Sequence, residues 1–275
     1  MNNTIHFINY NDDNLKMNKI SVAVPTYNSS KYLKSCISPF LDSNFADEVI
    51  VSDDCSDLKE FRKIKKIISK LNRTHKDKIQ LFRNEKNLGG FENKFRSIKR
   101  CKNNIVYQID SDNIPDKKSL NYLNTSIKKD FQQNTLYIPG SLKLFKKGKV
   151  NISKNIIDKI VIVQNDTLIN KKNIQSNIPV SNITSKDMDF VLNLGNWLFD
   201  KNTYLNNCKK GLNEDFASAD AVAVSYFWLT NNCEIKILSN LSHYHRLRPD
   251  SYYVTHKDKA DKKVIDLLGK LKNQK

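Results

Sequence analysis

Apolar residues in the first 110 positions form short continuous runs that are separated by longer, helically spaced segments. Continuous runs lie at 20–24 and 49–51, and two further strand candidates lie at 79–82 and 105–109. Apolar residues at intervals of three or four positions fill 30–40, 58–71 and 91–98. This alternation predicts a parallel sheet with crossover helices, and strands without polar alternation indicate a sheet covered on both faces.

After residue 112 the pattern is looser. It predicts a helix over 120–131, strands at 135–138 and 142–145, an apolar helix over 220–229, a strand at 234–238 and a basic helix over 259–272. The segment 146–186 has weak periodicity and receives no assignment. We therefore predict an α/β protein whose first half is better defined than its second.

Composition restricts the protein class. The 275 residues are 39% hydrophobic and carry 46 Lys plus Arg against 29 Asp plus Glu, a net charge of +17. This excludes a disulfide miniprotein, a collagen and a disordered tail. No run of 18 apolar residues and no apolar leader segment occurs, and the five cysteines form no CxxC pair. We expect a cytoplasmic protein whose cysteines are packing residues.

The positive charge is spread along the chain. Only seven of the basic residues are arginines, whereas nucleic-acid binders favour clustered arginine with interleaved aromatic residues. We therefore expect no specific nucleic-acid partner. The excess charge still attracts anionic surfaces until salt screens it.

Polar clusters follow three of the four predicted strands. They are Pro25-Thr26-Tyr27-Asn28, Asp53-Asp54 and Asp110-Ser111-Asp112. The carboxyl ends of parallel strands lie on one edge, so these clusters should meet there. Taken singly, these clusters can also have a structural role instead of binding a ligand: Asp53-Asp54 is typical of a helix N-cap, and an isolated DxD is typical of an exposed turn. The chain has neither GxGxxG nor GxxxxGK[ST], so something other than a glycine-rich loop would have to neutralise a phosphorylated ligand. The Asp110 and Asp112 carboxylates can hold a divalent ion that in turn binds a diphosphate.

The joint order of these motifs resembles the nucleotide-sugar-binding half of family 2 glycosyltransferases, which have the GT-A fold. The matching stretches are ISVAVPTYNSSKYLKSCI, DEVIVSDDCSD, NEKNLGGFENKFRSI and NIVYQIDSDNIP. A looser match in the acceptor half covers GNWLFDKNTYL, NEDFASADAVAVSYFWL and YHRLRPDSYY. The resemblance implies an inverting transferase that uses a nucleoside-diphosphate sugar.

The resemblance also implies roles for single residues of the first half. Pro25, Thr26, Tyr27 and Asn28 would form the base pocket, Asp54 would bind the base, and Asp53 would lie near the ribose. Asn87 and Gly89 match an NxG turn, and Lys94 stands where many members have an arginine that contacts the diphosphate. Asp110, Ser111 and Asp112 match the metal-binding DxD, with Mn²⁺ or Mg²⁺ as the implied cofactor.

In the second half the resemblance is less specific. Asp220 matches the acidic residue that opens the acceptor-side helix and would be the base, and Glu214 and Asp215 are close competitors because many members place ED there. The segment containing His243, His245, Arg246 and Arg248 is expected to be a loop near the diphosphate. Arg246 would bind it, and His245 is a candidate third metal ligand.

These observations give expected domains and an expected function. Residues 1–18 would be an extension, 19–256 a single GT-A domain (19–120 the nucleotide-sugar-binding half, 121–256 the acceptor half), and 257–275 a basic amphipathic helix. We expect transfer from a nucleoside-diphosphate sugar, with UDP favoured, to a glycan or lipid-linked acceptor in surface polysaccharide synthesis. The alternatives are a nucleotidyltransferase and a non-catalytic module that binds RNA or an anionic glycan.

The C-terminal helix allows two interpretations. Val264, Leu267, Leu268 and Leu271 form an apolar stripe surrounded by lysines. The stripe either packs on the domain or lies on an anionic bilayer, which would place the protein at the inner face of the membrane.

Overall fold

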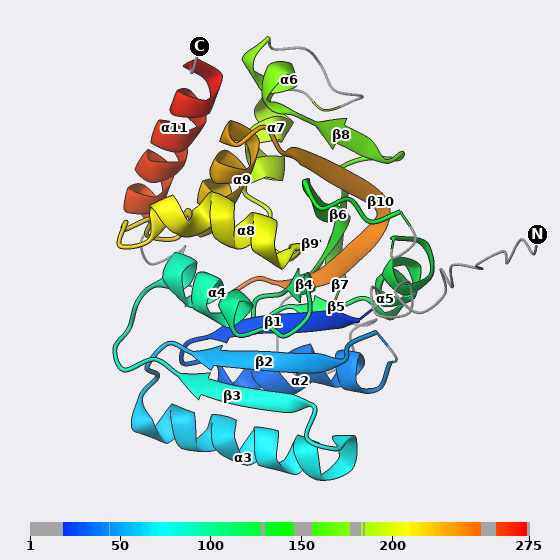
Figure 1. The fold of residues 1–275 in the computed structure, drawn as a ribbon, viewed down its shortest axis with the longest axis vertical. Coiled ribbons are helices and arrows are strands. Elements are labelled where there is room, and N and C mark those ends of the chain that lie inside the picture. The colour runs from blue at the N-terminus through cyan, green and yellow to red at the C-terminus, as the bar shows by residue number, and fades with distance from the viewer. Residues whose placement is uncertain are drawn as a thin grey trace, which may run out of the picture.

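The computed structural model describes residues 19–43, 45–127, 130–145, 156–176, 183, 185–248 and 257–273. One twisted sheet runs through the molecule, and helices pack on both of its faces (Figure 1). No helix among the described residues has the length and apolar character needed to cross a membrane.

The first part of the sheet is the parallel unit that the sequence predicts. Its strands are β1 (Ile20–Thr26), β2 (Glu48–Asp53), β3 (Ile79–Arg83) and β4 (Ile105–Gln108). They lie in the order β3-β2-β1-β4 and pair in parallel. The chain thus adds β2 and β3 on one side of β1 and then returns to place β4 on the other side.

The second part continues the same sheet with mixed strand directions. β9 (Trp197–Asp200) pairs antiparallel with β4, and β6 (Thr135–Phe145) and β10 (Glu234–Arg246) follow as a parallel pair. Three short strands complete the sheet: β5 (Ile114–Pro115), β7 (Ile156–Val161) and β8 (Thr167–Ile169). Both halves of the chain therefore share one sheet.

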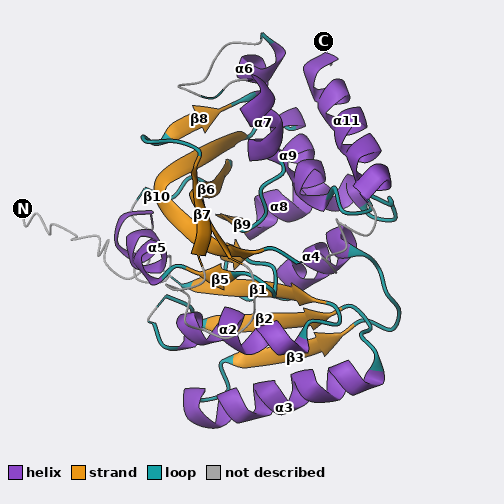
Figure 2. Ribbon diagram, turned by 180° about the vertical axis from the view of Figure 1, so that it is seen from behind, coloured by secondary structure: helices purple, strands orange, loops and turns teal. Residues whose placement is uncertain are grey.

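Helices cover this sheet on its two faces. On one face lie α2 (Ser30–Leu41), α3 (Leu58–His75) and α5 (Lys117–Tyr122), which continues as the π-helix η1 (Leu123–Ile127). The other side carries α4 (Gly90–Lys99), α8 (Lys201–Cys208), the short turn η3 (Lys209–Gly211) and α9 (Asp220–Thr230). α6 (Lys171–Gln175), α7 (Ser185–Leu192) and α11 (Lys257–Asn273) complete the described helices (Figure 2).

Strands β1, β2 and β4 are buried on both faces, as their apolar runs predict, whereas the edge strand β3 is only partly buried and its Gln80 is exposed. Along β1, Ile20, Val22 and Val24 belong to the core beneath α2 and α3, whereas Ala23 belongs to the core beneath α4. Side chains of a strand alternate between its faces, so one strand serves both cores. The three predicted crossover helices are confirmed as α2, α3 and α4.

Several predicted elements in the second half have different limits. The helix expected over 120–131 starts earlier, at Lys117, and its described helical part ends at Ile127. The two strands expected around Pro139-Gly140 are one strand, β6. A Cβ on Gly140 would lie 2.5 Å from the Leu238 carbonyl oxygen, so this glycine permits close strand packing instead of a turn.

The last strand corrects a further prediction. Residues 243–246 were expected in a loop, but β10 continues through them to Arg246. Their polar side chains suggested a loop, yet His243 and Arg246 are buried between neighbouring elements, with exposed fractions of 2% and 6%.

The predicted C-terminal helix is present as α11 and packs on α9 and α6. Leu267, Leu268 and Leu271 are 4%, 5% and 1% exposed. The apolar stripe therefore packs on the domain, as the first of the two interpretations states. These three leucines are covered by protein and are not available to a bilayer, whereas contact of the helix lysines with an anionic membrane stays a prediction.

Candidate active site

The sheet has a topological switch point between β1 and β4, where the strand order reverses. Ligands of open α/β sheets bind outside the carboxyl ends of the strands at such a point. The loop after β1 carries Tyr27 and Asn28, and the turn after β4 carries Asp110 and Asp112. Two of the three predicted polar clusters therefore flank the switch point directly.

The loop after β1 is held in place by the loop after β2. Asn28 has a left-handed backbone (φ 47°), its amide donates to Ser56 Oγ at 2.8 Å, and its Oδ1 accepts from the Asp57 amide at 3.0 Å. Tyr27 is 46% exposed, so its ring is available to a ligand. Pro25 and Thr26 end β1, and the buried Thr26 hydroxyl has no hydrogen-bond partner among the described residues.

Asp53 and Asp54 are buried and bonded to the protein. Asp53 accepts hydrogen bonds from the amide and hydroxyl of Ser56 and lies 3.5 Å from Arg83 Nε. Asp54 accepts from Asn84 Nδ2, the Leu88 amide and the Gly89 amide, each at 2.9 Å. Burial raises the pKa of both carboxyls, and these hydrogen bonds oppose that rise. In this structure the two side chains brace the loops that surround the site.

The NxG turn lies between Asp54 and α4. Asn87 Oδ1 accepts from the Gly89 amide at 3.0 Å, and Gly89 has a φ of 82°, which suits glycine. α4 starts at the next residue, Gly90, whose Cα faces Asp220: a Cβ there would lie 3.4 Å from the Asp220 carboxyl carbon. The turn thus starts α4 beside Asp220, the first residue of α9.

The turn after β4 presents the DxD carboxylates. The Asp110 amide donates to Asn196 Oδ1 at 2.9 Å, and the Asn113 amide donates to the Asp110 carbonyl at 3.0 Å. Ser111 is buried within the turn. Gly195 approaches so closely that a Cβ would lie 3.2 Å from Asp110 Oδ2. Asn196 and Gly195, from the second half of the chain, thereby fix the backbone and carboxylate of Asp110.

Lys94 is the centre of the candidate site. It lies on α4, is 6% exposed, and its ammonium contacts Asp110 Oδ1 at 3.0 Å and Asp220 Oδ2 at shorter range. It also lies over the Trp197 ring, 5.2 Å from the centroid. Burial by itself lowers the pKa of Lys94, but Asp110 and Asp220 outweigh it and raise the pKa above its usual range. Lys94 is therefore a stable cation that joins the two carboxylates.

Asp220 is the one candidate base that reaches this cluster. It is the first residue of α9, where the helix dipole favours a negative charge, and its side chain is 15% exposed. Glu214 and Asp215 lie in the preceding loop with side-chain exposures of 58% and 64%. They face α11, where Asp215 pairs with Lys259 at 2.5 Å and Glu214 with Lys263 at 3.9 Å. The structure separates these two acids from Lys94.

The end of β10 contacts the DxD turn from the other side. Arg246 Nε donates to the Asp112 carbonyl at 3.0 Å, and its guanidinium stacks between Tyr32 and Phe145, 4.4 Å from each centroid. Arg248 Nη1 pairs with Asp112 Oδ2 at 3.1 Å. Burial lowers the pKa of His245, and the adjacent Asp112 and Asp110 oppose this shift.

The DxD residues fit a divalent ion in chemistry. Asp110 and Asp112 offer the hard oxygen donors that Mg²⁺ and Mn²⁺ take, and the neutral imidazole favoured at His245 is a further possible ligand. Within the described ranges, however, no three His, Cys, Asp or Glu side chains are gathered as a ready metal site. Both carboxylates are instead paired with cations, Lys94 and Arg248.

Some residues that shape the site were not found from sequence reasoning. Asn84 and Asn93 are buried and bond each other at 3.1 Å, which links the NxG turn to β2 through the Ser52 carbonyl. Asn196 holds Asp110 and has a φ of 71°. Asparagine is common in this chain, so only its position next to Gly195 and Trp197 could have marked Asn196.

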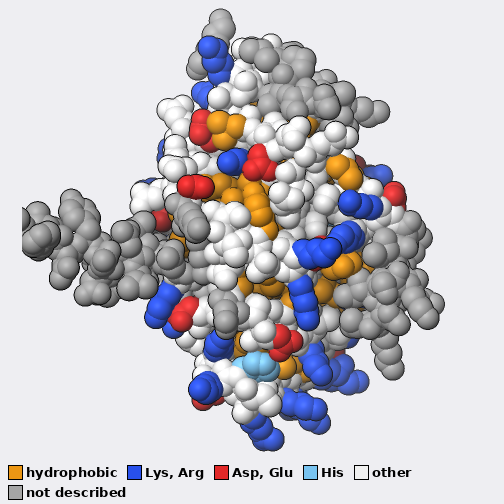
Figure 3. Space-filling view, turned by 90° about the vertical axis from the view of Figure 1, so that its right-hand side faces the viewer, with side chains coloured by type: hydrophobic (Ala, Val, Ile, Leu, Met, Phe, Trp, Pro, Cys, Tyr) orange, Lys and Arg blue, Asp and Glu red, His pale blue; other side chains and the backbone are white. Residues whose placement is uncertain are grey.

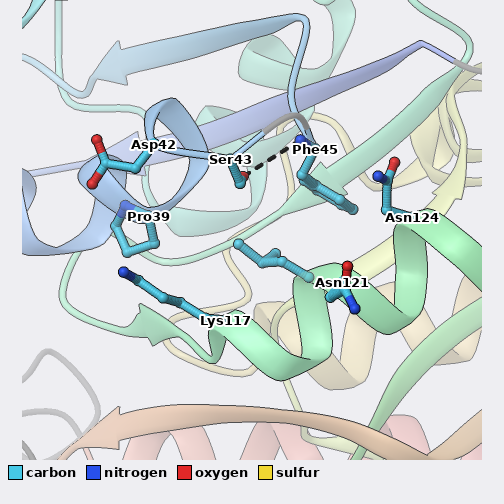
Figure 4. Close-up of a pocket in the computed structure, with 8 residues that line it drawn as sticks. Pro39, Asp42, Ser43, Phe45, Lys117, Asn121 and Asn124 are labelled. Atoms are coloured by element: carbon cyan, nitrogen blue, oxygen red, sulfur yellow. Dashed lines mark hydrogen bonds between the residues drawn. The ribbon is translucent and has the colours of Figure 1, made fainter.

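A separate cavity of about 340 Å³ lies at the far end of α2 (Figure 4). Asp42, Ser43 and Phe45 line one side, and Lys117, Asn121 and Asn124 line the other. α2 starts at the Tyr27 loop and runs for 12 residues, about 18 Å, before it reaches this cavity. None of the expected site residues lines it.

Comparison with known proteins extends these findings. Residues 21–181 match the family described as Glycosyl transferase family 2. The poly(ribitol-phosphate) beta-N-acetylglucosaminyltransferase TarS of Staphylococcus aureus (strain Mu50 / ATCC 700699) is 34% identical over 109 residues. That alignment covers 38% of this chain and 18% of TarS, so the chain matches about a fifth of the relative's length.

Solved structures share the fold. S. aureus TarS 1–349 in complex with UDP-GlcNAc superposes with a TM-score of 0.62 at 20% identity, covering 92% of this chain and 66% of that one. GalNAc-T7 with UDP, GalNAc and Mn²⁺ gives a TM-score of 0.60 at 12% identity, covering 84% of this chain and 44% of that one. These neighbours are GT-A glycosyltransferases, which confirms the predicted fold class. Because the family match spans more than half of the sequence and includes each motif of the first half, the chain belongs to glycosyltransferase family 2.

Proposed function

We propose that this protein transfers a sugar from a UDP-sugar, with UDP-N-acetylglucosamine the first candidate, to a hydroxyl group of a glycan or polyol-phosphate polymer. The observation that carries the proposal is the meeting of Asp110 and Asp220 on Lys94. This contact joins the DxD turn of the donor half to the first residue of the acceptor-side helix. The donor and the acceptor class are suggested by TarS, which is named for N-acetylglucosamine transfer to poly(ribitol-phosphate).

The donor would lie across the switch point. Tyr27, with nearly half of its surface exposed, offers a ring on which a nucleobase can stack. Thr26 offers a buried hydroxyl without a partner among the described residues, next to the braced Asn28 loop. Asp53 and Asp54 would support this pocket, and Asn87 and Gly89 would close it from the α4 side.

The diphosphate would lie near the DxD turn. Asp110 and Asp112 would hold a Mn²⁺ or Mg²⁺ ion, with His245 as a candidate third ligand, and the ion would supply charge stabilisation to the departing diphosphate. Lys94 and Arg246 are the protein cations on either side of this turn. Arg246 is held by two aromatic rings, so little conformational freedom remains to be lost on binding.

Asp220 would act as the general base. Its Oδ2 contacts Lys94, and its Oδ1 has no hydrogen bond among the described residues and can accept one from an acceptor hydroxyl. In the step, the acceptor oxygen attacks the anomeric carbon, its proton passes to Asp220, and the bond to the nucleoside diphosphate breaks with its electron pair. Attack opposite the leaving group inverts the anomeric centre.

A screen of nucleotide sugars tests this proposal. We expect metal-stimulated release of UDP from UDP-N-acetylglucosamine, and calorimetry at moderate salt should show that Mn²⁺ strengthens UDP binding. Formation of a nucleotide sugar from sugar phosphate and UTP would indicate a nucleotidyltransferase instead. Failure to bind any nucleoside diphosphate, with or without metal, would leave a non-catalytic binding module.

A further inference from the structure

The outer face of α3 carries a row of five cations that the candidate active site does not use. Lys59, Arg62, Lys66, Lys70 and Arg73 follow one another at intervals of three or four residues. Such intervals place side chains in one row along a helix. We call these five residues the basic row. Ile64, Ile68 and Leu71, the buried residues of α3, pack on the sheet from the opposite face of the helix.

The basic row lacks local compensation. Residues 58–78 contain nine Lys plus Arg and two acidic residues, 9 − 2 = +7, within a chain of net charge +17. Glu60 is paired with Lys63, outside the row. No ion pair joins any of the five to a carboxylate in the part of the chain that the structure describes. Like charges three or four residues apart on a helix repel one another, so the row has an energetic cost that an anionic partner would remove.

The other lysine-rich helix of this protein has the opposite arrangement. α11 is interspersed with acidic residues, and four of its lysines form ion pairs. The pairs are Lys259 with Asp215, Lys263 with Glu214, Lys270 with Asp266, and Lys272 with Asp189. The uncompensated row on α3 is therefore not a general consequence of a lysine-rich composition.

We propose that the basic row is a docking surface for a linear polyanion, a phosphodiester-linked polymer. From Lys59 to Arg73 the row extends about 21 Å, with a cation about every 5 Å. It is one helix wide and forms the lower end of the molecule, where Figure 3 shows Lys and Arg side chains gathered. A linear chain of phosphates can follow such a row and meet several cations at once.

The same face does not suit insertion into a bilayer. Interfacial helices bury an apolar face among the lipids, and the apolar face of α3 is already packed on the sheet. Along α3 the one exposed large hydrophobic side chain of the described structure is Leu58 at its first position, so no apolar stripe accompanies the basic row. The attraction that remains is electrostatic, and a flexible phosphate chain can follow the row more closely than a plane of headgroups can.

The position of the row relates it to the candidate active site. α3 begins at Leu58, next to Asp57, whose amide donates to Asn28 Oδ1. A polymer on the row thus has one end at the sheet edge that carries Tyr27 and the DxD turn. The surface would hold a polymeric phosphate independently of sugar transfer, and it would raise the local concentration of acceptor units if the acceptor is such a polymer.

The test compares two variants with the same net charge. The α3 variant replaces Arg62, Lys66, Lys70 and Arg73 with glutamine. The α11 variant replaces Lys257, Lys259, Lys262 and Lys270 with glutamine. Each variant therefore has a net charge of 17 − 4 = +13. The probe is fluorescently labelled inorganic polyphosphate, titrated at 50, 100 and 200 mM NaCl. If four phosphates contact the row, wild-type affinity should fall about 50-fold between 50 and 200 mM salt. Circular dichroism and UDP binding verify that each variant is folded.

The expected result is a loss of at least tenfold in affinity at 50 mM salt for the α3 variant, with a shallower salt dependence. The α11 variant should stay within threefold of wild type. Equal losses in both variants would show that net charge alone binds the polymer, and no loss in the α3 variant would also overturn the proposal. A third result would also overturn it: the α3 variant loses binding to phosphatidylglycerol vesicles but keeps binding to polyphosphate. Polyphosphate binding needs neither a sugar donor nor a metal ion. The docking proposal can therefore hold if sugar transfer is not found, and it can fail if sugar transfer is found.

Discussion

Replacement of Lys94 by methionine tests the junction between the two halves. The side chain is buried, and its ammonium contacts carboxylates from the turn after β4 and from the start of α9. Methionine keeps the length and the apolar stem of lysine but removes the charge. Asp110 and Asp220 would then face each other without a cation between them.

The loss of stability in Lys94→Met can be estimated from the positions of the two carboxylates. Both carboxylates contact the same nitrogen, so at a tetrahedral angle their nearest oxygens are about 4.4 Å apart, which corresponds to about 4 kcal/mol of repulsion at an effective dielectric constant of 20. The Asp110 side chain is 35% exposed, so water screens part of this repulsion. We expect the free energy of unfolding to fall by about 1–3 kcal/mol. The KM for the UDP-sugar should rise at least tenfold and kcat should fall, because Lys94 contacts both the DxD turn and Asp220, the proposed base.

Urea denaturation and initial-rate kinetics measure the two effects. Lys94→Arg should retain part of the activity because it keeps the cation, and Lys201→Met is a matched control. Lys201 donates to the Cys101 carbonyl at 2.9 Å, at the opposite end of β4. Its loss should lower stability by about 1 kcal/mol and leave KM and kcat unchanged. Wild-type kinetics in Lys94→Met would refute the reasoning, whatever the stability.

Further substitutions test separate parts of the account. Asp112→Ala should remove the stimulation of UDP binding by Mn²⁺ in calorimetry while circular dichroism shows a folded chain, and activity that persists in EDTA would contradict a metal role. Asp54→Asn should lower the free energy of unfolding by about 2–3 kcal/mol, because its carboxylate accepts three hydrogen bonds in a buried position; unchanged stability would show that these bonds are not the main support of the NxG turn. Gly195→Ala should displace Asp110 and reduce kcat, since a Cβ would lie 3.2 Å from Asp110 Oδ2. The control Gly269→Ala on α11, where a Cβ would meet no atom within 4 Å, should leave kcat unchanged and stabilise the helix by about 0.5–1 kcal/mol. Equal effects of the two substitutions on kcat would exclude a local cause at Asp110.

The first half of the fold could be predicted from sequence because its signals are local. Its strands are short and mainly apolar, three of the four are followed by a polar cluster, and each helix has a clear apolar face. The parallel pairing then places Tyr27, Asp54 and Asp110 on one edge without further information. The structure confirms this arrangement. It adds that Asp54 accepts hydrogen bonds from the Leu88 and Gly89 amides of the NxG turn, which are 34 and 35 positions away in the sequence.

The second half could not be predicted as well, because long-range contacts decide it. Gly140 resembles a turn residue, yet it lies within β6 where the Leu238 carbonyl approaches it. His243 and Arg246 look like loop residues, yet stacking and burial within the sheet accommodate them in β10. The contact of Lys94 with Asp220 joins residues 126 positions apart, so no local pattern could have distinguished Asp220 from Asp215.

The most direct measurement of the central claim is sugar transfer by Asp220→Asn and Asp215→Asn side by side. The account predicts that Asp220→Asn binds the UDP-sugar within threefold of wild type and transfers its sugar at least a hundredfold more slowly, since the base is lost but the donor pocket remains. Asp215→Asn, whose side chain is 64% exposed and paired with Lys259, should transfer at nearly the wild-type rate. Transfer that survives in Asp220→Asn and disappears in Asp215→Asn would contradict the account and place the base in the loop before α9.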